Sequence, residues 1–207
     1  MTLSLADRVE AFKAAFPKRE ASWPWIVQEG IGAERHEVLY AIWVIGQDYR
    51  NKTRFYGAYP HGYLDRVMAF FPELKTPAFP GHVLHVFSGS LPASPHYERC
   101  DLVEDAEIPV SVYDLPKIIL NHRPRLILAD PPYSREDATN YGTPMVDRRR
   151  AMRALAQVAD RGRHLVWLDT VWPMHRKAEW ITVGRILLQR STNHRTRVIT
   201  IFERRAA

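Results

Sequence analysis

Apolar side chains recur at helical spacing in the first part of the chain. Residues 4–16 carry one every three or four positions, which predicts an amphipathic helix. The same pattern predicts a second helix over about residues 33–45 and a third over about residues 62–71. The first and third of these segments end at a proline, which cannot continue a helix. Residues 1–75 are therefore expected to form a helical extension that packs on the rest of the chain.

Short apolar runs bounded by turn residues replace this pattern after a proline-rich link at residues 76–81. Such runs predict buried strands. We expect them at residues 83–87, 97–102, 110–113, 126–129, 164–168, 181–188 and 198–202. A helix is predicted at residues 146–159, and strands that alternate with helical or irregular connections indicate an α/β domain, residues 76–207, with a mostly parallel sheet. Residues 189–197 are too few for a helical crossover, so the last two strands should form an antiparallel hairpin.

Bulk composition is that of an ordinary globular protein. The 207 residues are 46% hydrophobic and 25% charged, and no apolar run is long enough to span a bilayer or act as a signal peptide. The single cysteine, Cys100, cannot form an intramolecular disulfide, which favours a cytoplasmic setting and argues against a cysteine-based zinc site. The histidines lack metal-ligand spacing, so we expect no metal.

Charge is distributed unevenly along the chain. From Met145 onward there are 14 Lys and Arg residues against 5 Asp and Glu, a net charge of +9, whereas the first 144 residues carry 15 against 18, a net charge of −3. A basic half suits phosphate contacts with a polyanion, and it is equally typical of a solvated, arginine-rich surface.

The most informative stretch is Asp130-Pro131-Pro132-Tyr133, which follows the apolar run at residues 126–129. Two prolines cannot donate to a strand ladder, so the strand must end in a rigid loop. In open α/β sheets, ligands bind at this carboxyl end of the strands. The loop offers the Asp130 carboxylate, backbone carbonyl groups and an aromatic face, which an exocyclic amine and its ring require.

This motif resembles that of the amino-methyltransferases of the N6-adenine and N4-cytosine type, whose signature is Asp/Asn/Ser-Pro-Pro-Tyr/Phe/Trp. The resemblance covers roughly residues 55–203, in which several of the family's motifs occur in the expected order. It implies a Rossmann-like class I methyltransferase fold, S-adenosyl-L-methionine as cofactor, and catalytic roles for Asp130, Pro131, Pro132 and Tyr133. The implied cofactor contacts are Phe87, Ser88, Gly89 and Ser90 in the turn after the first strand, Asp101 at the ribose hydroxyls, Asp114 and Leu115 beside the adenine, and Tyr56 and Gly57 near the methionine end.

Two departures from the family pattern concern the cofactor turn. Leu91 occupies the place of the second glycine in the family's Phe-x-Gly-x-Gly, so the turn must either be built differently or bind the cofactor more loosely. His85 stands where an acidic residue is common. A degenerate relative that binds nucleic acid without catalysis therefore remains an alternative.

Several further residues are candidates for substrate contact. Tyr141 follows the motif on a polar segment, and Trp172 follows the strand that ends at Asp169, which should open onto the same edge of the sheet. Asn193, His194 and Arg195 lie at the tip of the predicted hairpin, where they can reach phosphate or substrate. Each also has a plain structural interpretation, as a solvent-facing turn, a core tryptophan or a solvated hairpin tip.

The sequence as a whole predicts methyl transfer from S-adenosyl-L-methionine to an exocyclic amino group, with adenine N6 in DNA as the expected acceptor. RNA and protein side-chain amides are the alternatives. No segment has the character of a target-recognition domain, so a homodimer or a specificity partner is possible.

Overall fold

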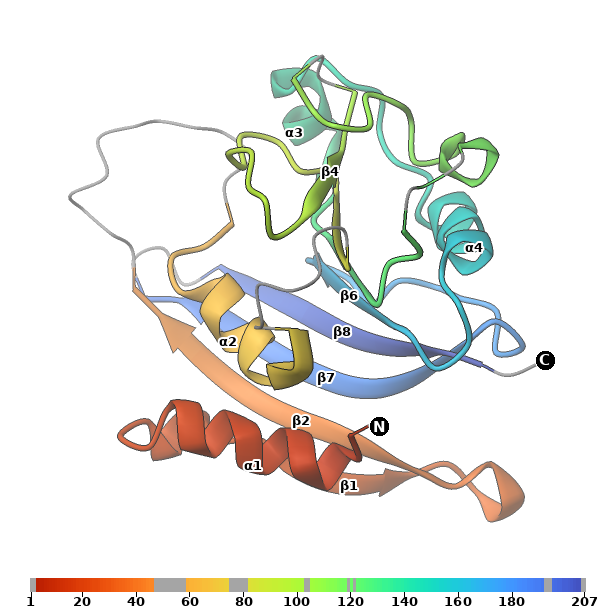
Figure 1. Cartoon of the computed structure of the whole chain (residues 1–207). Helices are drawn as coiled ribbons and strands as arrows, with labels where there is room; N and C mark the ends of the chain where they lie inside the picture. The colour runs from red at the N-terminus through yellow and green to blue at the C-terminus, as the bar shows by residue number, and fades with distance from the viewer. Residues whose placement is uncertain are drawn as a thin grey trace.

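The central strands form from short apolar runs that are buried on both faces, as parallel sheets require. The computed structural model describes residues 3–46, 59–74, 82–102, 105–118, 120, 122–191 and 195–205. Strands β3 (Val83–Val86), β5 (Leu126–Ala129) and β6 (His164–Asp169) are buried at every position. They pair in parallel with one another and with β4 (Glu98–Cys100), at the end of a sheet ordered β1-β2-β7-β8-β6-β5-β3-β4 (Figure 1).

A long antiparallel hairpin continues this sheet. Strands β7 (Trp180–Arg190) and β8 (Thr196–Arg204) pair with each other, and β8 pairs antiparallel with β6. The prediction of a C-terminal antiparallel hairpin is therefore confirmed, as is the α/β, Rossmann-like character of the fold. The hairpin register shifts between Thr182 and Gly184, a β-bulge that bends β7.

The N-terminal segment forms two of the predicted helices. Helix α1 (Leu5–Ala15) begins with a capping box in which Ser4 and Asp7 exchange hydrogen bonds, and α2 (Tyr63–Ala69) begins after Gly62. The short turns η1 (Glu20–Ser22), η2 (Gly32–Glu34) and η3 (Pro72–Leu74) join these elements.

The helix predicted over residues 33–45 is wrong. This segment is β2 (His36–Ile45), which pairs in parallel with β7 and antiparallel with β1 (Trp25–Glu29). Its residues are rich in β-branched and aromatic side chains, and those at 39, 41, 43 and 45 alternate onto a buried face packed against α1. Two strands therefore lie within residues 1–75, and the division of the chain at residue 75 stays a prediction.

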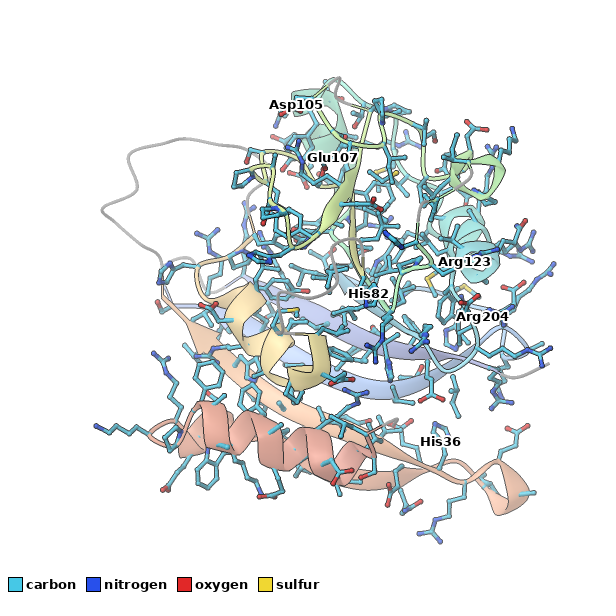
Figure 2. The ribbon with its side chains drawn as sticks, in the orientation of Figure 1. His36, His82, Asp105, Glu107, Arg123 and Arg204 are labelled. Atoms are coloured by element: carbon cyan, nitrogen blue, oxygen red, sulfur yellow. The ribbon has the colours of Figure 1, made fainter. Side chains whose placement is uncertain are left out.

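The strand predicted at residues 110–113 is also wrong. Only Ile108 forms a bridge, to Cys100 at the end of β4, and Pro109 then removes the next backbone donor. The chain continues as turns into η4 (Leu115–Lys117). Buried Arg99 secures this region with ion pairs to Asp105 and Glu107, which are labelled on the loop after β4 in Figure 2.

Two apolar layers cover the sheet. Helices α1 and α2 pack on one face, and α4 (Arg148–Val158) packs on the other, while α3 (Arg135–Asn140) follows β5 (Figure 1). Within the described part of the chain, no helix combines the length and the apolar character that a bilayer crossing needs. After β3 the chain moves outward to β4, then returns to β5 on the other side of β3. This reversal creates a crevice at the carboxyl ends of the strands, where ligands bind in such sheets.

Candidate functional site

A cavity of about 560 Å³ lies at the carboxyl ends of β3 and β5. The chain leaves these two neighbouring strands in opposite directions along the sheet, and a crevice is expected at such a point. The residues expected at the site that line this cavity are Phe87, Gly89, Ser90, Asp101, Asp130, Pro131, Pro132, Tyr133, Tyr141 and Arg195. The structure therefore brings together segments that are more than 100 positions apart in the sequence.

Asp130 lies on the loop directly after β5 and lines this cavity. Its pKa is raised from 3.8 to about 6, mainly because burial disfavours the carboxylate, although the positive charge of Arg197 and the Tyr133 hydroxyl oppose this rise. The Tyr133 hydroxyl donates a hydrogen bond to the Asp130 carboxylate. The guanidinium of Arg197 lies 4.7 Å from the centroid of the Tyr133 ring. Asp130 is therefore held in place by its neighbours and keeps lone pairs for a further donor.

A buried ion pair positions the loop from behind. The Arg148 guanidinium donates to Asp169, from Nε to Oδ2 at 2.6 Å and from Nη2 to Oδ1 at 3.0 Å, and Nη2 also donates to the backbone oxygen of Tyr133 at 3.2 Å. Asp169 is fully buried and also accepts from Trp167 Nε1 at 3.0 Å. The expectation that Asp169 opens onto the site edge is therefore wrong, because its carboxylate is used by Arg148 at the start of α4.

The turn after β3 differs from a two-glycine turn. Positive φ angles fall on Phe87 (59°) and Gly89 (53°), and Leu91 closes the turn by donating its backbone N–H to Ser88 O at 3.0 Å. A positive φ is uncommon for a phenylalanine and strains the backbone, which is a feature of ligand-binding turns. Leu91 therefore needs no left-handed conformation. Ser88, predicted to touch the cofactor, is buried away from the cavity, and its hydroxyl has no hydrogen-bond partner among the described residues.

Asp101 links this turn to the end of β4. Its Oδ2 accepts from the backbone N–H of Gly89 at 2.8 Å, and its Oδ1 accepts from that of Leu102 at 2.7 Å. Each carboxylate oxygen has two lone pairs, so both oxygens can accept another hydrogen bond from a ligand in the cavity. The acid holds the glycine turn against the β4 end and also lines the cavity.

His85 serves a structural role behind the turn. It is buried, its Nδ1 lies 3.2 Å from the Tyr59 hydroxyl, and its ring packs edge-on against Tyr97. Burial lowers the pKa of His85 to about 3, so the ring is neutral. A neutral ring can occupy an interior position in which an unpaired carboxylate would be costly.

Two residues expected beside the cofactor adenine lie elsewhere. Asp114 is half-exposed and paired with Lys117 at 2.6 Å, and Leu115 is buried in the core beneath α4. The cavity is instead lined by the residues just before them, Val110, Ser111, Val112 and Tyr113. The chain forms a turn directly after Pro109, so residues 110–113 line the cavity in place of residues 114 and 115.

Trp172 does not wall the cavity, in contrast to the expectation. Its side chain is 45% exposed, and the Arg185 guanidinium lies 5.6 Å from the centroid of its ring. The segment after β6 therefore turns away from the cavity. Tyr56, Gly57, Asn193 and His194 lie outside the described residues.

Sequence reasoning missed two arginines of the hairpin. Arg190 at the end of β7 and Arg197 near the start of β8 line the cavity together with the predicted Arg195. Neither Arg190 nor Arg197 forms an ion pair with a carboxylate among the described residues. Burial and the neighbouring charges of Arg197 and Arg195 lower the pKa of Arg190. The signal available in the sequence was their position at the two ends of a hairpin whose tip was expected at the site.

Among the described residues, no group of three or more His, Cys, Asp or Glu side chains is placed so that it could hold a metal ion. The cavity instead combines a carboxylate floor at Asp101 and Asp130, apolar walls and a basic rim. Such a lining suits a ligand with a flat ring, hydroxyl or amino donors and negative charge.

Similarities to known proteins are weak. No protein-family model matches the chain, and no curated protein matches it. Among solved structures, the N-methyltransferase NodS from Bradyrhizobium japonicum WM9 is similar at 11% identity and a TM-score of 0.42, over 70% of this chain and 98% of that one. TrmN from Thermus thermophilus is similar at 13% identity and a TM-score of 0.43, over 99% of this chain and 80% of that one. A putative methyltransferase from Streptococcus mutans is similar at 12% identity and a TM-score of 0.41, over 98% of this chain and 82% of that one. Similarities at these scores do not indicate the function of this protein, which has to be inferred from the residues of the cavity.

Proposed function

We propose that this protein transfers a methyl group from S-adenosyl-L-methionine to an exocyclic amino group, adenine N6 in DNA. The observation that carries the proposal is the placement of Asp130-Pro131-Pro132-Tyr133 at the carboxyl end of β5, inside a cavity that also reaches the turn after β3. The motif and the turn line the same cavity, as transfer between two bound molecules requires.

The residues of the cavity fit the proposed cofactor. Its volume of about 560 Å³ falls within the usual range for small-molecule sites. Asp101 has lone pairs for the ribose hydroxyls, and Val110 and Val112 offer an apolar surface to the adenine ring. When bound, S-adenosyl-L-methionine supplies a methyl group on a sulfonium, which is already an activated leaving group. Positioning by the protein should therefore supply most of the rate gain.

Asp130 and the loop around it orient the acceptor amine. The carboxylate accepts one amine hydrogen and a backbone carbonyl beside Pro131 accepts the other, which points the nitrogen lone pair at the methyl group. The amine joins or replaces the Tyr133 hydroxyl at Asp130. Since Arg197 lies over the Tyr133 ring, a base that stacks on this ring uses the opposite face or displaces the guanidinium.

The basic rim supports a nucleic-acid substrate. Arg190, Arg195 and Arg197 border the same cavity as Asp130, so phosphates that flank the acceptor base would meet positive charge as the base enters. An adenine in duplex DNA has to leave the helical stack first, at a cost of a few kcal/mol. Contacts of the rim with the flanking phosphates would offset part of this cost.

The test is methyl transfer from donor labelled in its methyl group to DNA, RNA and total protein in separate reactions. We expect label in DNA, as N6-methyladenine after hydrolysis, and no label with Asp130→Ala, which retains its fold and its binding of the methyl donor by calorimetry. Asp160→Ala, an exposed acid of the same chain, is the matched control and should retain full activity. Label in RNA or protein alone would refute DNA as the substrate. Full activity of Asp130→Ala would refute the proposed role of the motif.

A further inference from the structure

A second cavity lies at the opposite edge of the sheet. It measures about 230 Å³ and is bordered by the residues that immediately precede β5 and begin β6, whereas the catalytic cavity lies beyond the other ends of these strands. Its walls are Arg8, Phe71, Glu73, Leu74, Arg125, Gly162, Arg163 and His164. Most of these walls are polar, and nothing in the proposed methyl transfer uses them.

Positive charge dominates this second cavity. Arg125 and Arg163 stand side by side because Leu126 pairs with His164, and neither guanidinium has a hydrogen bond or ion pair with the described residues. Arg8 is 4% exposed and is held by Phe70 O at 2.6 Å and by Glu73 Oε1 at 3.0 Å. A site with three guanidinium groups and one carboxylate has a net charge of +2, which favours an anion.

The histidines around the cavity reflect the same field. The pKa of His164 is lowered to about 3 by burial and by the nearby charges of Arg8 and Arg163, so the ring is neutral. His82, which precedes β3 and is labelled in Figure 2, also has a lowered pKa, from burial first and then from Arg125, His122 and Arg163. The titratable groups that face this edge therefore share a positive potential.

One acceptor in this basic setting lacks a donor. Glu73 Oε1 is paired with Arg8, but Glu73 Oε2 is buried and has no hydrogen-bond partner among the described residues. A carboxylate oxygen is only an acceptor, so a bound molecule has to bring a hydrogen to satisfy it. The cavity thus presents donors on Arg8, Arg125 and Arg163 and one acceptor on Glu73.

We propose that this cavity binds a protonated oxyanion of phosphate size, either the hydrogen phosphate ion or a phosphate monoester that carries one proton. The arginines contact its charged oxygens, and its P–OH group donates to Glu73 Oε2. Arginine pairs with phosphate oxygens through two parallel N–H groups, which suits Arg125 and Arg163 as neighbours. Sulfate and an internal phosphodiester have no such proton at neutral pH, so each leaves two acceptors facing each other.

This complementarity predicts a marked choice between anions of nearly equal size and shape. Sulfate matches the arginines as well as phosphate does, but its oxygen would meet the Glu73 carboxylate with no hydrogen between them. An uncompensated contact of this kind weakens binding by about tenfold or more. The proposal is independent of the methyl transfer, since the two cavities share no residue.

The experiment is calorimetric titration of the full-length protein with sodium phosphate and with sodium sulfate at pH 6 and equal ionic strength. We expect saturable binding of phosphate and at least tenfold weaker binding of sulfate. A short oligonucleotide with a 5′-phosphate and the same oligonucleotide without it distinguish the sources. If the phosphorylated strand binds and competes with phosphate, the ligand is a terminal phosphate monoester. If it does not compete, the ligand is the free phosphate ion. Equal binding of phosphate and sulfate, or no binding of phosphate, overturns the proposal.

Variants separate this site from general surface charge. Arg125→Gln with Arg163→Gln should lower phosphate affinity at least tenfold, and the fold should survive because neither side chain supports a described contact. Glu73→Gln supplies an amide donor and should bring phosphate and sulfate affinities close together. Arg161→Gln, an exposed arginine on the same edge but outside the cavity, is the matched control and should bind phosphate as the wild type does. Unchanged phosphate affinity in the double variant would also overturn the proposal.

Discussion

Replacing Asp130 by asparagine should stabilise the protein at neutral pH. The Asp130 carboxyl lines the cavity and accepts a hydrogen bond from the Tyr133 hydroxyl, and its removal from water raises its pKa from 3.8 to about 6 in the folded state. Folding therefore opposes ionisation of this group. Asparagine is close in shape, is never charged, and keeps an oxygen that can accept from the Tyr133 hydroxyl.

The magnitude follows from the difference between the two pKa values. A shift from 3.8 to about 6 corresponds to about 3 kcal/mol at 1.36 kcal/mol per pKa unit. Because the folded-state pKa is the higher one, the stability associated with protonated Asp130 is fully present below pH 3.8 and is lost as the pH rises through 6. Asparagine undergoes no such loss, so its advantage should grow from near zero at pH 4 to at most about 3 kcal/mol at pH 8.

The assay is urea unfolding of the wild type and Asp130→Asn at half-unit steps between pH 4 and pH 8, with exposed Asp160→Asn as control. We expect the difference in free energy of unfolding to rise over this range for Asp130→Asn and to stay flat for Asp160→Asn. A difference that is independent of pH, or an Asp130→Asn protein less stable than the wild type at pH 8, would refute the reasoning.

Three further predictions concern the loop, the rim and the hairpin. Arg148→Met breaks the pair with buried Asp169, so the free energy of unfolding should fall by about 3 kcal/mol. Its kcat should also fall, with little change in KM for the methyl donor. Arg148→Lys should recover part of the lost stability and part of the lost kcat. Arg197→Gln should weaken DNA binding and lower the slope of log affinity against log salt by about 0.9 in a fluorescence titration. Gly184→Ala places a Cβ 2.9 Å from the Ile201 side chain and should lower the free energy of unfolding by about 1–3 kcal/mol in urea. Unchanged kcat, slope or unfolding midpoint would contradict the respective prediction.

The parallel strands and the hairpin were predictable because their apolar runs are short, continuous and bounded by turn residues. The segment at residues 33–45 was not, because its apolar positions fit both a helical and an alternating pattern. Pairing with β7, far away in the sequence, decides between the two. Tertiary context overrode local spacing in this segment.

The site was predictable at its motif and less so at its borders. Asp130 and Asp101 were predictable because they follow buried strands, and strand ends meet at one edge of the sheet. The shift of the lining from Asp114 to Val112 depends on a turn after Pro109, which no periodic pattern records. Arg148 contacts the loop at the backbone oxygen of Tyr133 and is held there by its pair with Asp169. Such contacts between distant positions leave no spacing signal in a single sequence.

The pairing of β2 with β7 has a consequence for how the protein is made. Leu39 lies opposite Gly184, so 145 positions of chain (184 − 39) have to be synthesised before this contact can form. Until then the edge of β2 that faces away from β1 has no partner strand, and afterwards β2 covers the edge of β7, which would otherwise be an open template for another chain. Contacts of such large sequence separation fold slowly. The nascent protein therefore depends on its last hairpin to cover the open edge of the β1–β2 pair, which limits aggregation.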